Sequence, residues 1–263
     1  LGVSIPIIPS HYSYYLLDGS DRLIMDQLKV PTGNIGEYNI AASFGNYVGS
    51  LTSASNNAIV PFLMSMYKRN EHKRAKLIIY GWLLSILSIT FSICLWAKEL
   101  FEILVKNDIL KQSYPLAIIM IMAYNFRPVF IGAYQYMVFR EKTKTIWLVS
   151  FFAGLISVGS NLIFIPLFGF KAAIFSLYFS FFYWGVGLYF TRSYRLIRKE
   201  NYRPIGLSMV IVVITFLVFL LKDISQASKL IISVMSLSGF LFLLVHIFKL
   251  TRIEANSDSL RSV

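Results

Sequence analysis

A row of small polar side chains runs along a segment that is otherwise apolar enough to cross a membrane. Its members recur at alternating spacings of four and three residues: Asn39, Ser43, Asn46, Ser50, Ser53 and Asn57. On a helix these positions fall within a narrow arc. Because lipid tails offer no hydrogen bonds, the arc must face protein or water. It is therefore either a seam where helices pack and hydrogen-bond or the lining of a polar cavity, and it indicates a membrane protein with a polar interior.

The composition indicates that lipid surrounds most of this chain. Hydrophobic residues make up 56% of the sequence and charged residues only 14%, which is a smaller charged share than in soluble domains. The apolar residues form runs of about the length that crosses a hydrocarbon core of roughly 30 Å. We expect eight spans, at residues 3–28, 35–66, 77–96, 114–139, 145–165, 170–190, 205–221 and 230–248. The sequence thus predicts an all-α fold, a polytopic transmembrane helical bundle of about eight spans.

The distribution of positive charge predicts the orientation of this bundle. Sixteen Lys and Arg residues lie in the connections after the second, fourth and sixth spans and in the tail, against seven in the other connections. By the positive-inside rule the sixteen are cytoplasmic, and both ends of the chain lie with them. Basic loops beside an anionic leaflet also account for the net charge of +12, so nucleic acid is not an expected partner.

The sequence contains no pattern that is typical of an active site. Cys94 is the single cysteine and lies in an apolar run, and the three His residues are not at metal-ligand spacing. Phosphate-binding glycine motifs, nucleophile elbows and paired catalytic carboxylates are also absent from the sequence. We therefore expect no enzymatic activity, no catalytic residues, no metal site and no cofactor.

The first span carries charges that a bilayer would not tolerate on a lipid-facing side. A helix places Asp18, Arg22, Asp26 and Lys29 on one face, with Asp21 at its edge, and Asp18 precedes Arg22 by four residues in the favourable acid-first order. Ionisable groups at this depth normally face a bundle interior or an aqueous cavity. The alternative is that Asp21 and Arg22 form a structural ion pair near the membrane interface.

The fourth span contains Arg127 near its middle, with Tyr124, Tyr134 and Gln135 on the same helical face. An arginine at this depth indicates a functional group rather than a packing element. Pro128 follows it directly, and because proline lacks a backbone N–H we expect a kink at the same place. The fifth span has a similar row without charge, which favours plain helix packing: Ser150, Gly154, Ser157 and Asn161.

Three segments resemble bacterial polysaccharide transporters. Residues 161–176 run from Asn161 through an apolar stretch to a turn at Pro166 and Gly169, and re-enter through Ala172 and Ala173. This segment is similar to the hairpin between two late spans of that family. Two further matches are residues 21–42, with an Asp-Arg pair followed by a Gly-x-Tyr-x-x-Ala helix start, and a proline near the end of the second span before a basic loop.

The resemblance implies the O-antigen or capsule flippase branch of the multidrug, oligosaccharidyl-lipid and polysaccharide exporter superfamily. Its members have two lobes and about 12–14 spans, and by alternating access they move an undecaprenyl-diphosphate-linked oligosaccharide across the bacterial cytoplasmic membrane. The chain then corresponds to the second lobe at residues 1–191, two additional spans at 192–250 and a cytoplasmic tail at 251–263. The chain begins at Leu1, inside an apolar run, so we expect it to be the C-terminal part of a longer protein or a truncated product. A missing N-terminal lobe, or a second copy, is the expected partner beside the lipid bilayer.

Candidate substrate-binding residues follow from the cargo that the resemblance implies. An arginine can hold phosphate oxygens in a fork, which favours Arg127 and, as a second contact, Arg22. Amide and hydroxyl groups can bind sugars without fixing one sugar type, which adds Asn46, Ser50, Asn57, Tyr124 and Gln135. Asp18 or Asp21 is a possible ion-coupling group that carries a proton or a cation.

Four alternative functions stay open, and one of them is a scaffold that does not transport. A multidrug or toxin exporter of the same superfamily moves organic cations and favours acidic residues over arginine in its cavity. A lipid II exporter has the same architecture. A membrane-embedded polymerase or ligase for polysaccharide assembly usually needs a large outer loop, and the longest one here, residues 97–113, is short.

Overall fold

The computed structural model describes the backbone of residues 7–260. The side chains of residues 7–11, 14, 18, 246–248 and 250–260 lie outside this description, and so do residues 1–6 and 261–263 altogether. Within the described residues the chain is helical, with short connections and no strand. The predicted all-α bundle is therefore confirmed.

Each of the eight predicted spans corresponds to helical structure, except that residues 3–6 of the first span lie outside the described residues. The long helices, in chain order, are α1 (Ile7–Gln27), α2 (Thr32–Lys68), α3 (His72–Leu95), α6 (Tyr114–Ala123) with α7 (Phe126–Phe139), α8 (Ile146–Phe168), α9 (Ala172–Phe190), α11 (Pro204–Leu221) and α12 (Gln226–Leu260). Shorter helices lie in the connections: α4 (Ala97–Leu104), α5 (Asp108–Lys111), the 3-10 turn η1 (Thr143–Thr145) and α10 (Arg192–Ile197). Helix α12 continues through most of the predicted tail.

Six helical segments in the described part of the chain are long and apolar enough to cross a membrane, and the protein is therefore a membrane protein. They contain α3, α6 with α7, α8, α9, α11 and α12. Helices α1 and α2 are also long enough, since 21 and 37 residues at about 1.5 Å per residue exceed roughly 30 Å. Charged residues in α1 and the polar row in α2 keep their hydropathy below that of the other six.

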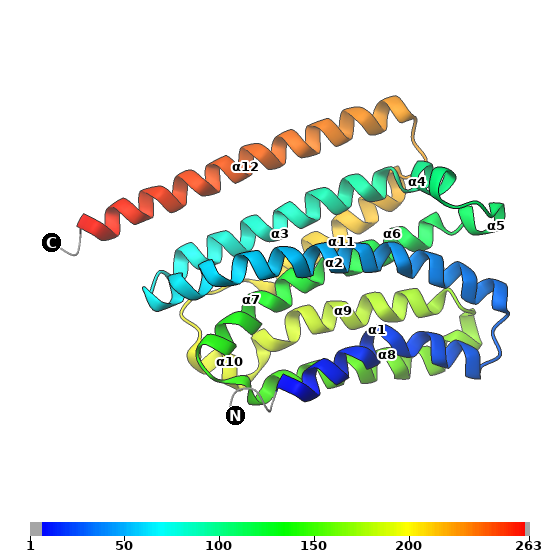
Figure 1. The fold of residues 1–263 in the computed structure, drawn as a ribbon, viewed down its shortest axis with the longest axis horizontal. Helices are drawn as coiled ribbons and strands as arrows, with labels where there is room; N and C mark the ends of the chain where they lie inside the picture. Colours follow the sequence, from blue (N-terminus) through cyan, green and yellow to red (C-terminus); the bar gives the residue numbers. More distant parts are fainter. Residues whose placement is uncertain (1–6, 261–263) are drawn as a thin grey trace.

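The helices form a bundle whose centre is the fourth span. Figure 1 shows α2 crossing the middle of the bundle, α1 beside α8 at one edge and α12 at the opposite edge. The segment made of α6 and α7 is the most deeply buried of the six spans and contacts α2, α3, α9 and α11. Helix α1 packs mainly on α8, and α12 packs mainly on α3.

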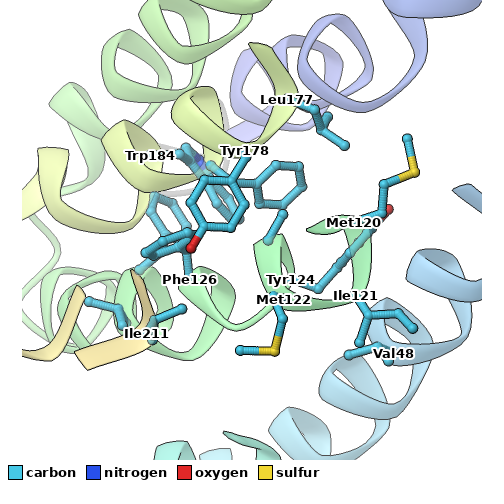
Figure 2. Close-up of a cluster of buried hydrophobic side chains, with 14 of the residues drawn as sticks. Val48, Met120, Ile121, Met122, Tyr124, Phe126, Leu177, Tyr178, Trp184 and Ile211 are labelled. Atoms are coloured by element: carbon cyan, nitrogen blue, oxygen red, sulfur yellow. The ribbon is translucent and has the colours of Figure 1, made fainter. Parts of the chain in front are cut away.

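The fourth span is broken in the middle, as Pro128 predicts. Helix α6 ends at Ala123 and α7 begins at Phe126, so Tyr124 and Asn125 lie in the break. Side chains from α6, α7 and α9 converge around it together with Val48 of α2 and Ile211 of α11 (Figure 2). On the α9 side, Phe130 stacks on Trp184 with ring centroids 3.9 Å apart. The break is thus embedded in aromatic packing, since the rings of Tyr124 and Phe126 also contact Phe181 and Tyr178.

The connections at the two ends of the bundle differ in charge. The basic connections after α2, α7 and α9 lie at one end, and those after α1, α3, α8 and α11 at the other (Figure 1). This segregation follows from helices that alternate in direction. It is the arrangement that the positive-inside rule requires, and it leaves the assignment of that end to the cytoplasm as a prediction.

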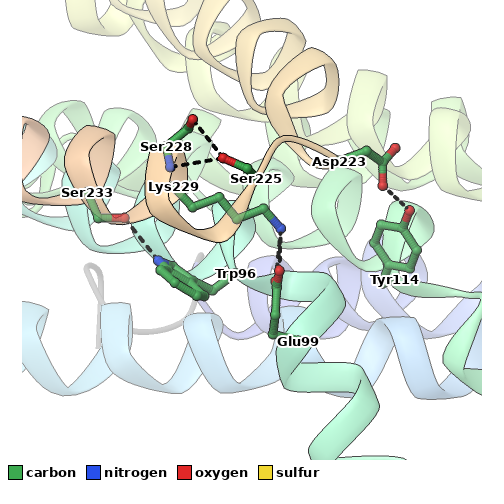
Figure 3. A network of polar contacts seen from close by, with 8 residues as sticks. All are labelled: Trp96, Glu99, Tyr114, Asp223, Ser225, Ser228, Lys229 and Ser233. Carbon is green, nitrogen blue, oxygen red and sulfur yellow. Dashed lines mark hydrogen bonds and ion pairs between the residues drawn. The ribbon is translucent and has the colours of Figure 1, made fainter.

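A polar network joins α12 to the bundle at the less basic end (Figure 3). The ammonium of Lys229 lies 2.7 and 2.9 Å from the two carboxylate oxygens of Glu99, and the Lys229 residue is fully buried. The Trp96 indole donates to Ser233 at 3.0 Å. The Tyr114 hydroxyl donates to Asp223 at 2.6 Å, which is the main reason that the pKa of Asp223 lies below its usual value. These contacts hold the start of α12, a helix that packs along α3 and is otherwise largely exposed.

Candidate functional site

The polar row of α2 faces outward from this chain over its middle part. Asn46, Ser50 and Asn57 are exposed, and we refer to these three residues as the open polar face. Asn39, Ser43 and Ser53 are half-buried; the Ser43 hydroxyl donates to the Asn39 carbonyl at 2.8 Å. A packing seam within this chain would bury the row. The exposed part therefore fits a cavity lining or a contact with a further lobe.

Beside the open polar face, α2 approaches the break of the fourth span closely. The ring of Tyr124 lies over Gly45 and Gly49, where a Cβ atom would come within 2.9 and 2.7 Å of ring carbons. The Tyr124 hydroxyl donates to Asn46 Oδ1 at 2.6 Å. The tyrosine ring is buried, so two glycines one turn apart create the groove that it fills.

Arg127 reaches α2 at the same place. Its Nη1 donates to the carbonyl oxygen of Gly49 at 3.0 Å, and that oxygen also accepts from the Ser53 hydroxyl at 3.0 Å. Arg127 is half-buried rather than enclosed, so a positive group lies at mid-span beside the open polar face.

Gln135 lies two turns farther along α7 and is buried. Its amide nitrogen lies 3.4 Å from Asn56 Oδ1, and the Trp82 indole donates to Ser55 at 2.9 Å. These contacts join α7 and α3 to the side of α2 next to Asn57. Gln135 therefore contacts the neighbour of a candidate residue and does not itself lie on the open polar face.

The charged residues of α1 lie on different sides of that helix. Arg22 and Asp26 are exposed, while Asp21 has no exposed surface. The prediction that Lys29 shares their helical face is wrong, because α1 ends at Gln27 and Lys29 lies in the following turn with a positive φ of 54°. The structure thus directs Asp21 and its neighbour Arg22 to different environments. The side chain of Asp18 lies outside the described residues.

Asp21 is the centre of a buried polar cluster between α1, α2 and α8. Its Oδ1 accepts from the Asn161 amide at 2.6 Å and from the Ser157 hydroxyl at 3.2 Å. Its Oδ2 accepts a hydrogen bond from the Tyr38 hydroxyl. Asn161 Oδ1, in contrast, is buried without a hydrogen-bond partner. The cluster ties the first, second and fifth spans together through one carboxyl group.

Three partners of Asp21 were not candidates on sequence grounds. Ser157 and Asn161 belong to the row in the fifth span that predicts plain packing, and Tyr38 appears only in the resemblance. That row is indeed buried against α1, where a Cβ at Gly154 would lie 2.9 Å from Leu16. A row of Ser and Asn beside an acidic span is the signal that would have identified the cluster.

The structure brings some of the candidate residues together and keeps others apart. Tyr124, Arg127, Asn46 and Gly49 form one contact group at the α2 face of the fourth span. Arg22 lies on α1, which packs on α8 and α9 rather than against that group. Within the described residues no three His, Cys, Asp or Glu side chains gather as metal ligands would.

The close approach of the Tyr124 ring to Gly45 and Gly49 leads to a prediction about the stability of the fold. We expect Gly49→Ala to lower the free energy of unfolding, because its methyl would lie 2.7 Å from the Tyr124 ring. Overpacking of this kind costs about 1–3 kcal/mol, which outweighs a gain in helix propensity of roughly 1 kcal/mol. Gly159→Ala is the matched control, since nothing lies within 4 Å of that Cβ position. Equal midpoints of thermal unfolding in detergent for the two variants would contradict the close approach.

Comparison with family models, curated proteins and solved structures finds no match to this chain. The polysaccharide-transporter resemblance therefore stands on the residues quoted for it. It stays a prediction.

Proposed function

We propose that this chain is the second lobe of a flippase that moves lipid-linked oligosaccharides across the bacterial cytoplasmic membrane. In this proposal the cargo is an undecaprenyl-diphosphate-linked repeat unit, and both ends of the chain are cytoplasmic. Together with its partner lobe, the chain would transport the cargo without covalent chemistry. Alternating access of two lobes moves the cargo's polar part, while its lipid tail stays in the bilayer.

The proposal rests chiefly on the position of Arg127. A broken span holds this guanidinium half-buried near the middle of its length, against the backbone of α2 and beside the open polar face. Charged groups inside membrane spans commonly mark a substrate pathway, and a positive group at this place suits an anionic cargo. A diphosphate fits, because guanidinium groups bind phosphate oxygens with two parallel hydrogen bonds.

The open polar face is proposed to bind the sugar part of the cargo, as Arg127 is proposed to bind the diphosphate. Asn46, Ser50 and Asn57 offer amides and hydroxyls that can hydrogen-bond the many hydroxyls of an oligosaccharide. None of them carries a charge, so they support sugars of varied identity. Tyr124, whose hydroxyl donates to Asn46, holds the amide of that residue in place beside Arg127.

A partner must complete the cavity in this proposal. The open polar face lies on the surface of this chain, where lipid would be a poor neighbour for it. An N-terminal lobe, or a second copy of the chain, would cover the same face and enclose an aqueous cavity. Half of a rocking transporter without such a partner is not expected to transport.

Asp21 is the proposed coupling group for a proton or a cation. Its carboxyl group links three spans and is shielded from solvent, so gaining or losing a charge there changes what holds those spans together. Arg22 and Asp26 are exposed on the same helix and are less suited to this role.

We expect Asp21→Asn to slow transport on the order of tenfold and to remove its dependence on an ion gradient, because the amide cannot titrate yet still accepts hydrogen bonds. Asp26→Asn, on the exposed side of α1, is the control and should leave both properties unchanged. Transport in proteoliposomes with imposed proton and sodium gradients measures this. Undiminished gradient dependence in the Asp21→Asn variant would exclude Asp21 as the coupling group.

The main rival is an exporter of organic cations from the same superfamily. The buried carboxyl group of Asp21 is the observation in its favour, since such exporters use acidic residues. Arg127 opposes it, because a cationic cargo would meet a like charge at mid-span. Resistance to cationic dyes, conferred by the gene without restoration of polymer, would select this rival.

Complementation tests the proposal directly. The gene in its full natural length is expressed in a bacterium that lacks its own surface-polysaccharide flippase and makes a matched repeat unit. We expect surface polymer to return. Failure of a well-expressed and correctly inserted protein to restore polymer would reject the proposed cargo.

A further inference from the structure

The break in the fourth span has a definite backbone pattern. Pro128 has no N–H to donate to the Tyr124 carbonyl, which instead accepts from the Arg127 N–H at 3.1 Å. The Asn125 N–H donates to the Met122 carbonyl at 3.1 Å. Two tightened turns thus replace regular helix between α6 and α7. The angle between α6 and α7 decides the direction in which the side chains near the break extend.

Asn125 and Arg127 leave this break toward different helices. Arg127 donates to Gly49 of α2. The side chain of Asn125 is fully buried; its amide nitrogen lies 3.3 Å from the Met122 carbonyl oxygen and its Oδ1 lies 3.0 Å from the Thr90 hydroxyl of α3. The break is therefore held from two sides, by α2 through Arg127 and by α3 through Asn125.

The contact between Thr90 and Asn125 is unusual for its surroundings. Thr90 is also fully buried, and an apolar pair would fill this core without polar groups to satisfy. The Thr90 hydroxyl lies 3.0 Å from the Leu87 carbonyl oxygen as well as from Asn125 Oδ1. Its single hydrogen serves one acceptor at a time, so the contact with Asn125 can open while the hydroxyl keeps a partner.

We propose that Thr90 and Asn125 are positioning residues, which hold the break of the fourth span at the angle that places Arg127 on α2 beside the open polar face. This inference rests on the proposed function, in which Arg127 binds the cargo diphosphate. Thr90 acts from α3 through Asn125 and does not touch the cargo. When α2 and α3 shift during alternating access, opening of the contact lets the break change its angle and withdraw Arg127.

The test compares Thr90→Val, which removes the hydroxyl at nearly constant shape, with Thr90→Ser, which keeps it. Ser180→Ala is a control, because the Ser180 hydroxyl is buried and donates within its own helix to the Ser176 carbonyl. The full chain is reconstituted in nanodiscs. Two quantities are measured, the Kd for inorganic pyrophosphate and the rate of amide hydrogen exchange in residues 120–128 and 45–53. Thermal unfolding midpoints show whether each variant is folded.

We expect Thr90→Val to weaken pyrophosphate binding about fivefold to tenfold and to speed exchange in both segments. Thr90→Ser and Ser180→Ala should match the unmodified chain in both measurements. A loss of stability alone would lower the unfolding midpoint and speed exchange throughout, including α8 and α9. Faster exchange confined to the two segments, with restoration by serine, separates positioning from a general structural role.

The same experiment distinguishes this inference from the proposed function. An unmodified chain that fails to bind pyrophosphate counts against the proposed cargo contact. In that case the hydrogen-exchange measurement by itself tests the positioning role. Unchanged exchange in the two segments of a folded Thr90→Val variant overturns the inference. Asn125→Leu provides a second route should Thr90→Val not fold, with the same expected changes and the same overturning result.

Discussion

Arg127→Ala is expected to abolish most transport of lipid-linked oligosaccharide while the protein still inserts and folds. The variant loses the guanidinium that lies against Gly49 and beside the open polar face. Hydrogen bonds to charged groups contribute about 1.5–3 kcal/mol, which corresponds to a loss of roughly 10- to 150-fold in transport rate or cargo affinity. Complementation gives the first measurement, and flipping of labelled lipid-linked oligosaccharide in proteoliposomes gives the rate.

Two further variants show what this loss means. Arg127→Lys keeps the charge without the planar fork and should recover only part of the activity. Arg140→Gln removes an exposed arginine at the end of the same span and should have no effect. Full transport by a well-expressed Arg127→Ala variant would leave the flippase proposal in place and reject Arg127 as its anchor.

Lys229→Met is expected to cause the largest loss of stability among the substitutions considered. Lys229 is fully buried and both carboxylate oxygens of Glu99 lie within 2.9 Å of its ammonium (Figure 3). Removing one partner leaves Glu99, whose side chain is only 18% exposed, without its counter-charge. Breaking a buried ion pair costs about 3–5 kcal/mol. Because α12 is largely exposed and packs mainly on α3, we expect it to separate from the bundle before the other helices unfold. The unfolding midpoint in detergent measures the change.

The double variant Lys229→Met with Glu99→Leu gives this prediction a sharp control. Replacing both charges with apolar groups removes the desolvation cost as well as the attraction, so most of the lost stability should return. Lys111→Met is a second control, since its ion pair with the fully exposed Asp108 is screened by solvent and contributes little to stability. Equal losses from Lys229→Met and Lys111→Met would show that the buried pair is not what holds α12.

Helix content and span positions could be predicted from the sequence because lipid imposes one dominant rule. A segment in hydrocarbon must satisfy its own backbone hydrogen bonds, so each apolar run of sufficient length becomes a helix. Pro128 predicts the break of the fourth span for the same local reason, because a missing N–H is a property of the residue itself. The spacing of the row in α2 likewise places its members on one face without knowledge of any neighbour.

Which side chains contact one another across helices could not be predicted in the same way. Asp21 and Arg22 are adjacent in the sequence and only about 100° apart on a helix. One is buried and the other exposed, because Ser157 and Asn161 approach α1 from a helix more than a hundred residues later. The glycines at 45 and 49 and the amide of Asn125 gain their roles from the same kind of distant contact.

What the sequence by itself determined is a membrane bundle with a polar row in its second span and an arginine beside a proline in its fourth. These follow from composition, periodicity and single-residue chemistry, which act locally. Only the tertiary structure decided that Arg127 and Tyr124 meet α2, that Gln135 is buried, and that Asp21 joins three spans. Those outcomes depend on which helices are in contact and on where along their length they meet. Burial between helices also changes the free-energy cost of each polar group that is removed from solvent.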